Sequence, residues 1–316
     1  MGIVARQNSA PNEARLRLKK SNQVLSGIGL AIAAVAAFAT LDTCTKFVSA
    51  SLPVFMALWL RYGIQAVITT AIVLPTKGMA VFRTAHPRFQ LLRGLLLISI
   101  SFLAFFSLKY MPVAEFTAIA LTAPLLITLL AAVVLKEQVS VARWLLVIGG
   151  FAGTMIIIRP GNAAFEWTTL LPLGLVASNA LFQVLTSKMA RTEDPITMHL
   201  YTGWVGTLLM SVMMPFVWTG FPSWSILAWL LLMGVAAAIG HFLLILAYQR
   251  APAASLTPYL YSGIGFAMLG GWIVFSHVPD KWAFVGMAMI ALCGALGAWL
   301  AVKEGRARDR ILEYVD

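Results

Sequence analysis

Long apolar segments alternate with short polar breaks along almost the whole chain. From Leu25 to Val302 the apolar runs reach the roughly 20 residues that a helix needs to cross a hydrocarbon core about 30 Å thick. The breaks, such as 49–53, 158–162 and 277–281, contain residues that favour turns. The pattern predicts about ten membrane-spanning helices, at 25–48, 54–74, 91–108, 113–134, 142–158, 167–189, 196–217, 224–247, 254–275 and 282–302.

The composition excludes an ordinary soluble domain. Of the 316 residues, 60% are hydrophobic and 11% are charged, whereas a typical globular protein has roughly 25% charged residues. We therefore expect an all-α protein embedded in the lipid bilayer, with no soluble domain appended.

The net charge of +11 could indicate a nucleic-acid partner, but its distribution along the chain has a simpler explanation. Cytoplasmic loops of membrane proteins are enriched in Lys and Arg. If both termini are cytoplasmic, only Lys109, Arg159 and Lys281 among the basic residues of the loops lie outside. We therefore expect no nucleic-acid partner. The cytoplasmic set is Arg6, Arg15, Arg17, Lys19, Lys20, Lys77, Arg83, Arg88, Arg93, Lys136, Arg143, Lys188, Arg191, Arg250, Lys303, Arg306, Arg308 and Arg310.

The first apolar run has some features of a signal peptide. A basic segment precedes it, and the stretch Ala37-Phe38-Ala39 resembles a cleavage site. The run continues to Val48, however, and the charge distribution requires it, so we expect it to be retained as the first span. Cys44 and Cys293 lie in spans far apart, so they indicate neither a disulfide nor a metal site, and we expect no cofactor.

The second half of the chain is a diverged copy of the first. A shift of 140 residues aligns 110–144 with 250–284 without a gap, and it pairs Pro112 with Pro252 and Thr117 with Thr257. Each copy holds five spans, an odd number, so the second copy must enter the membrane from the opposite side. The sequence thus predicts two inverted five-helix repeats, at 25–160 and 161–302, between a basic segment 1–24 and a tail 303–316.

Several landmarks of this pattern resemble the EamA-type members of the drug/metabolite transporter superfamily. They are Tyr110 to Ala114, Ala123-Pro124, Glu137, Pro252 to Ala254, and Pro258. The resemblance implies ten helices, with spans 1–4 and 6–9 around a central cavity and spans 5 and 10 at the periphery. Where the family usually has a glutamate at the end of span 9, this chain has His277.

Three charged residues lie within the first two spans. Asp42 and Lys46 are four residues apart on one helix face, and Arg61 lies at a similar depth in the next span. A charge near the bilayer centre costs about 3 kcal/mol on insertion scales, so such residues face the bundle interior and find partners. One interpretation is an ion-pair cluster that fixes helix packing. The other is a site where Arg61 or Lys46 attracts a substrate anion and Asp42 holds a cation or exchanges a proton.

Other polar residues at membrane depth are candidates for lining the same cavity. Asn179 and Gln183 form a polar stripe on span 6, although such residues also serve as hydrogen-bonding contacts between helices. Pro258 is expected to loosen span 9 and free backbone carbonyls. The remaining cavity candidates are Tyr201, Trp204, His241, Tyr259, Tyr261 and Phe266, and the gate or coupling candidates are Asp42, Glu115 and Glu137.

Small residues line one face of span 5 and one face of span 10. They are typical of close helix contacts, either within the chain or between the protomers of a homodimer. The set is Gly149, Gly150, Gly153, Cys293, Gly294 and Gly297.

These features favour a transporter over other membrane proteins. An intramembrane enzyme would need a nucleophile with its base, or a metal cluster, and the chain has no His-Glu-x-x-His or Gly-x-Ser-x-Gly motif. A channel is less favoured because inverted repeats suit alternating access. The charged and aromatic cavity residues favour export or exchange of a small amphiphilic metabolite that resembles an amino acid. The alternative is uptake of a larger metabolite, such as S-adenosylmethionine or riboflavin.

Overall fold

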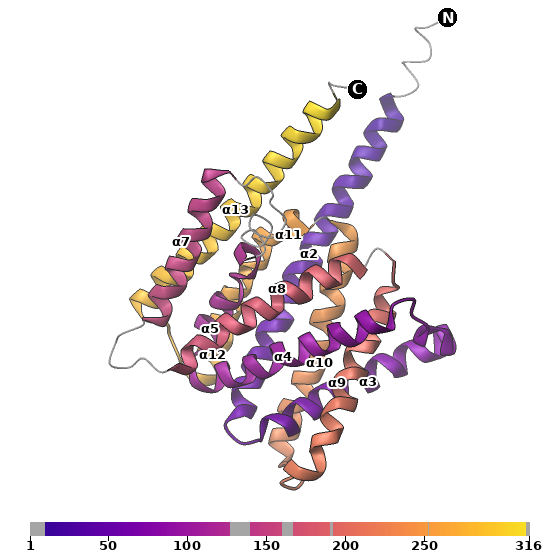
Figure 1. Cartoon of the computed structure of the whole chain (residues 1–316), viewed down its shortest axis with the longest axis vertical. Coiled ribbons are helices and arrows are strands. Elements are labelled where there is room, and N and C mark those ends of the chain that lie inside the picture. Colours follow the sequence, from indigo (N-terminus) through magenta and orange to yellow (C-terminus); the bar gives the residue numbers. More distant parts are fainter. Residues whose placement is uncertain (1–9, 127–139, 160–166, 190–191, 252, 314–316) are drawn as a thin grey trace, which may run out of the picture.

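A computed structural model describes residues 10–126, 140–159, 167–189, 192–251 and 253–313. Within these ranges the regular structure is entirely helical (Figure 1). The elements are α2 Ala10–Ser49, α3 Val54–Lys77, η1 Gly78–Phe82, α4 Pro87–Tyr110, α5 Val113–Ala120, α7 Val141–Ile158, η2 Trp167–Leu170, α8 Leu171–Met189, α9 Pro195–Val217, α10 Trp224–Arg250, α11 Ala253–Leu260, α12 Ser262–Phe275 and α13 Lys281–Glu313.

Most of these helices have the length and composition of membrane spans. Eight segments of the described chain are long and apolar enough to cross a bilayer, and two shorter apolar helices cover Val113–Leu126 and Leu171–Thr186. Each of these segments overlaps a span that the sequence predicts. The protein is therefore an all-helical, multi-pass membrane protein.

Polar and proline residues set where several helices begin. Ser140 and Asp194 are N-caps whose side chains accept hydrogen bonds from the backbone N–H groups of Arg143 and Ile196. These bonds satisfy N–H groups that have no partner within the helix. Pro87 and Pro195 occupy the first helical positions, where a missing N–H costs nothing.

Four pairs of helices form the main contacts of the bundle. They are α2 with α10, α3 with α9, α4 with α8, and α7 with α13. Glycines allow close approach in the second pair: a Cβ on Gly203 would lie 3.0 Å from the Cα of Ala66, and one on Gly206 would collide with the ring of Tyr62. The α3–α9 interface is therefore packed backbone against backbone.

The helices α7 and α13 lie side by side at one edge of the bundle (Figure 1). Their contact uses the small-residue faces that the sequence indicates. A Cβ on Gly153 would lie 2.8 Å from the carbonyl oxygen of Gly286, and a Cβ on Gly149 would lie 2.7 Å from the sulfur of Cys293. The face of α7 therefore packs against α13 within a single chain through Cys293 and Gly286, whereas a Cβ on Gly294 would meet Tyr261 instead.

Two helices of the bundle are interrupted at corresponding positions. The helix α5 ends at Ala120, and Leu121 and Thr122 form a turn before the chain becomes helical again. The helix α11 ends at Leu260, and Tyr261 separates it from α12. Both short helices have 8 residues, and each bound of α11 lies about 140 residues after the matching bound of α5, as in repeated units.

The first and last helices extend beyond their apolar segments. The span in α2 covers Gln23–Ser49 and the span in α13 covers Lys281–Leu300, whereas the helices begin at Ala10 and end at Glu313. Figure 1 shows both extensions leaving the bundle at the same end.

Candidate functional site

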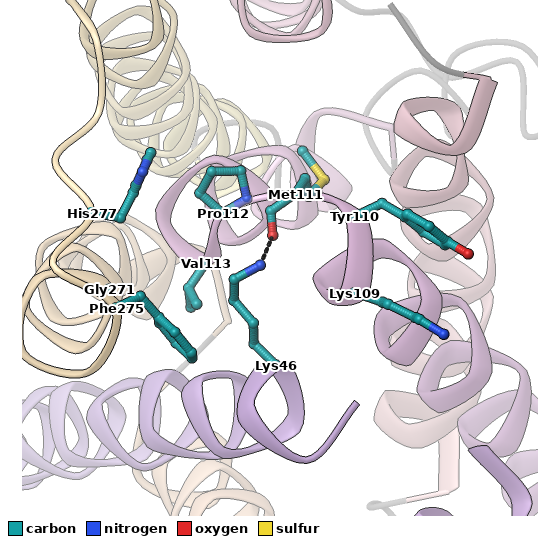
Figure 2. A pocket seen from close by; sticks show the side chains of 9 residues that line it. All are labelled: Lys46, Lys109, Tyr110, Met111, Pro112, Val113, Gly271, Phe275 and His277. Atoms are coloured by element: carbon teal, nitrogen blue, oxygen red, sulfur yellow. Dashed lines mark hydrogen bonds between the residues drawn. The ribbon is translucent and has the colours of Figure 1, made fainter. Parts of the chain in front are cut away.

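A cavity of about 310 Å³ opens where the last turn of α2 meets the α4–α5 junction and the end of α12. Figure 2 shows Lys46 reaching into it from α2, with His277 and Phe275 on one side and Tyr110 and Lys109 on the other. The lining residues are Lys46, Lys109, Tyr110, Met111, Pro112, Val113, Gly271, Phe275 and His277.

Lys46 contacts the end of α4. Its Nζ donates hydrogen bonds to the carbonyl oxygens of Leu108 and Met111, each at 2.9 Å, and Figure 2 shows the bond to Met111. Carbonyls at a helix C-terminus lack intrahelical partners and carry a partial negative charge, so an ammonium group stabilises them. The same Nζ lies 5.6 Å from the ring centroid of Phe275. Lys46 thus caps α4 and connects α2 to α12.

Glu115 and His277 connect the two halves of the chain beside this cavity. The distance from Nε2 of His277 to Oε1 of Glu115 is 3.1 Å. Glu115 is buried, with 7% of its surface exposed, and its second oxygen Oε2 has no hydrogen-bond partner. His277 follows α12, and Glu115 lies in the first turn of α5.

Arg61 belongs to a second polar cluster, inside the bundle. Its Nη1 donates to Oγ of Ser101 at 2.6 Å, and Ser101 is 2.7 Å from the hydroxyl of Tyr62. The Tyr62 hydroxyl also lies 3.1 Å from the carbonyl oxygen of Leu97. Arg61 has 5% of its surface exposed, and its Nε has no partner. Its guanidinium forms no ion pair with a described residue.

Asp42 forms no ion pair with Lys46 or with Arg61. Its Oδ2 accepts a hydrogen bond from Thr117 at 3.4 Å, and it interacts electrostatically with Arg61. Asp42 is half-buried. Although Asp42 and Lys46 are four residues apart, Lys46 is directed to the end of α4, where two carbonyl oxygens receive it. The described residues thus contain no ion pair among the three charges.

Two histidines, His241 and His199, lie inside the bundle near the arginines. The ring of His241 lies 5.0 Å from that of Phe38 in an edge-to-face arrangement, and His241 interacts electrostatically with Arg61 and Arg93. His199 is buried, and its Nδ1 has no partner. Among the described residues, no three His, Cys, Asp or Glu side chains come together as metal ligands.

The tyrosines that the sequence analysis named as cavity candidates do not share one site. The hydroxyl of Tyr201 donates to the carbonyl oxygen of Phe82 at 2.8 Å, beside η1 rather than at the charges. Tyr261 is buried against Gly294 of α13, and its hydroxyl has no partner. Tyr259 is 42% exposed. Glu137 lies outside the described residues.

The polar stripe on α8 stays a candidate for lining the cavity, on the ground of its position in the helix. Asn179 and Gln183 are both half-buried, one helical turn apart. Trp204 donates from Nε1 to Thr70 at 3.0 Å, which fixes its indole between α9 and α3.

Four polar residues close to Arg61 or Asp42 were not named as site candidates by the sequence analysis. They are Tyr62, Gln65, Ser101 and Thr117. A signal for Gln65 was present, because it lies four residues after Arg61 and therefore on the same face of α3. Ser101 carries no comparable signal, since small hydroxyl side chains are common in membrane helices and often bond their own backbone. Thr117 pairs with Thr257 in the alignment of the repeats, but that pairing does not indicate its contact with Asp42.

The sequence is similar to known membrane transporters. Residues 25–159 match the EamA-like transporter family. A riboflavin transporter of Vibrio cholerae is 30% identical over 86% of this chain and 93% of its own length. An S-adenosylmethionine uptake transporter of Rickettsia felis is 25% identical, covering 84% and 90%. A pseudopaline exporter of Pseudomonas aeruginosa is 26% identical, covering 86% and 95%.

A solved crystal structure has the same fold. It superimposes with a TM-score of 0.64 over 88% of this chain and 98% of the other, at 20% sequence identity. The matched family and the named relatives are transporters rather than enzymes, as the sequence analysis expects.

Proposed function

The chain belongs to the EamA-like transporter family of the drug/metabolite transporter superfamily, and from this premise we propose that it is a secondary transporter of the inner or plasma membrane. It has ten spans in two inverted repeats and moves a small amphiphilic metabolite by alternating access. Both termini are cytoplasmic, which agrees with the basic loops on their side and with the exit of α2 and α13 at one end of the bundle.

The helix contacts support the inverted repeat. Exchanging the two halves replaces α2, α3, α4, α5 and α7 by α8, α9, α10, the α11–α12 pair and α13. The contact of α2 with α10 then becomes that of α8 with α4, and the contact of α3 with α10 becomes that of α9 with α4. The pairs α3–α9, α5–α12 and α7–α13 map onto themselves. Two halves related in this way can exchange conformations and open to each side in turn.

The interrupted helices support the same proposal. Discontinuous helices at corresponding positions of inverted repeats are where many secondary transporters bind substrate, because the break frees backbone groups. Here α5 and α12 are in contact, and Thr117 of α5 holds Asp42. The breaks and the buried charges therefore occupy the same part of the bundle.

The main observation in favour of a binding function is that Arg61 is buried and only partly hydrogen-bonded. It is a buried cation with an unpartnered Nε and no ion pair to a described residue. Arg61 interacts electrostatically with Asp42, and its guanidinium lies 4.9 Å from the ring centroid of Tyr62, but neither contact is an ion pair. Charged residues at membrane depth are costly and mark functional sites. An anionic group of the substrate would supply the missing partner.

The substrate we favour resembles an amino acid, with a charged head and an apolar or aromatic body, and it is exported or exchanged. Arg61 would receive its carboxylate, and Asp42 would receive its ammonium group or exchange a proton during the cycle. The alternative is uptake of a larger metabolite, which the names of the riboflavin and S-adenosylmethionine transporters favour. The name of the pseudopaline exporter favours outward transport.

Counterflow in proteoliposomes tests this proposal. We expect purified protein to accumulate labelled substrate against a preloaded unlabelled pool, which neither an enzyme nor a channel does. The probes are phenylalanine, methionine, S-adenosylmethionine and riboflavin. Absence of counterflow for this set and for a wider metabolite panel would contradict the transporter proposal.

The variant Arg61→Ala separates binding from packing. We expect it to insert at wild-type levels and to lose at least about tenfold of the counterflow rate, since a charged hydrogen bond contributes about 1.5–3 kcal/mol. The control is Trp59→Phe, which removes another hydrogen bond of α3, from Nε1 of Trp59 to Oγ of Ser211, at a residue outside the candidate set. Wild-type flux in Arg61→Ala would remove the anion-binding role, and failure to insert would favour the packing interpretation.

A further inference from the structure

Gln65 is a fully buried carboxamide that uses none of its hydrogen-bonding capacity. Its exposed fraction is 0%, and neither Oε1 nor Nε2 has a partner among the described residues. An amide taken from water without a compensating hydrogen bond is strongly destabilising. A leucine of similar volume would be the better residue for packing alone. The ligand-free protein therefore gains nothing from this carboxamide.

Gln65 lies on the same face of α3 as Arg61. The two residues are one turn apart on α3, so their side chains leave the helix on the same face. Nε of Arg61 is the other buried donor on that face that has no partner. Two such neighbours, a guanidinium N–H and an amide N–H, match the two oxygens of a carboxylate, which accepts parallel hydrogen bonds.

We propose that Gln65 and Arg61 together form the anchor for a carboxylate of the transported molecule. This inference rests on the proposed transport function and adds a specificity-determining residue to its site. Gln65 would donate one of the two N–H groups of its amide to one carboxylate oxygen while Arg61 holds the second. Asp42 interacts with the same guanidinium, so a substrate cation would be held beside its own carboxylate.

The place of α3 in the bundle explains how a closed site can take a ligand. The helix α3 of the first half packs against α9 and α10 of the second half. Gly203, Gly206 and Gly234 bring these helices so close that an added Cβ would meet Ala66, Tyr62 or Ile64. Movement of one half against the other separates this interface and exposes Arg61 and Gln65. The unpartnered groups are thus buried only while the halves are closed.

Thermal unfolding of the detergent-purified full chain tests the anchor with matched probes. The pairs are methionine with methioninamide and phenylalanine with phenylalaninamide, and S-adenosylmethionine and riboflavin are added singly. We expect a carboxylate probe to raise the wild-type midpoint and its amide to fail. In Gln65→Leu the same carboxylate should bind at least about tenfold more weakly.

A second glutamine provides the matched control. Gln90 is also buried, but its Nε2 lies 3.4 Å from Oγ1 of Thr84, near the α3–α4 connection. We expect Gln90→Leu to keep the preference for the carboxylate. Equal loss in both variants, or wild-type affinity in Gln65→Leu, would overturn the anchor. Stabilisation by riboflavin alone would leave the transport proposal standing and overturn the carboxylate anchor.

The ligand-free midpoints test the inference whichever probe binds. Because the carboxamide has no partner in the closed protein, Gln65→Leu should unfold about 2–4 °C above the wild type without ligand. A midpoint equal to or below that of the wild type would mean that Gln65 is already satisfied by water or by a structural contact. That result overturns the proposal even where a probe binds.

Discussion

At the residue scale, the three charges of the first two spans have separate surroundings. Lys46 binds two carbonyl oxygens at the end of α4, Asp42 accepts from Thr117, and Arg61 donates to Ser101. The sequence predicted that such charges would face the bundle interior, because exposing a charged side chain to lipid is energetically costly. It could not predict the partners, since backbone carbonyls and small hydroxyl groups carry no signal in the sequence.

Lys46 is expected to act on stability through its carbonyl contacts. The variant Lys46→Met keeps an unbranched side chain only one atom shorter and removes both charge-assisted hydrogen bonds. We expect the free energy of unfolding to fall by about 2–4 kcal/mol, read from chemical or thermal unfolding in detergent. Lys109→Met, at an exposed position of the same cavity, is the control and should change it by less than about 0.5 kcal/mol. Equal effects of the two would contradict the capping role.

At the element scale, the helix boundaries follow from local chemistry that the sequence carries openly. Pro53, Ser140, Asp194 and Ser223 directly precede helices, and each lies in a gap between two spans that the sequence predicts. The interruption of α5 was not predicted. Pro124 provides a local cause, because a proline has no N–H to donate to the carbonyl of Ala120 and its ring clashes with that carbonyl, so α5 ends there. Pro258 is the corresponding signal in the second half, where the interruption lies at Tyr261.

The α7–α13 pair depends on the absence of side chains at its crossing. Gly153→Ala would place a Cβ 2.8 Å from the backbone oxygen of Gly286, and we expect a loss of about 1–3 kcal/mol in the free energy of unfolding. In α2, a Cβ on Gly29 has no atom within 4 Å, so Gly29→Ala is the control. It should be neutral or stabilise by up to about 1 kcal/mol. A destabilised control with a neutral Gly153→Ala would refute this explanation.

The start of α13 should depend on pH. Asp280 pairs with Arg159 and accepts from the N–H of Ala283, and these bonds, with that to Arg159 foremost, lower the pKa of the Asp280 carboxyl. A lowered pKa stabilises the folded protein above the unfolded value of about 3.9 and loses that stabilisation as the pH falls through the folded value.

The variant Asp280→Asn isolates this contribution. Because the pair is exposed, the wild type should exceed the variant by less than about 1 kcal/mol at pH 7. The difference should stay constant from pH 7 to about 5 and shrink as the pH falls further, past the unfolded value of about 3.9 to about 3. Unfolding midpoints of the two proteins across that range are the measurement, and a gap that widens towards acid would contradict the assignment.

At the scale of the whole molecule, the length and order of the apolar segments predicted an all-helical membrane fold. The bilayer fixes the length of a span, and a run of apolar residues is therefore easy to read. The way in which helices distant in the sequence pair, such as α2 with α10, was only implied by the inverted repeat. Contacts of that kind depend on small residues at single positions, such as Gly240 against Phe38, and the hydrophobic pattern does not record them.

Glu115 and His277 connect the halves at one end and should act as a gate. In a background of Cys44→Ala and Cys293→Ala, the pair Glu115→Cys and His277→Cys would place two thiols across the contact. We expect a short, reducible thiol cross-linker to abolish counterflow and a reductant to restore it, because the cross-link holds one end closed. Single-cysteine variants treated identically are the controls. Full counterflow by fully cross-linked protein would remove the gate role.

The helices α2 and α13 both project from the same end of the bundle as continuous helical extensions. The helix α2 has 40 residues and α13 has 33, so at 1.5 Å per residue they measure about 60 Å and about 50 Å, against a hydrocarbon core of about 30 Å. A soluble helical protein fused in register to either end would turn with the bundle as one body. Such a fusion would stand clear of the detergent micelle and serve as an alignment marker for electron microscopy.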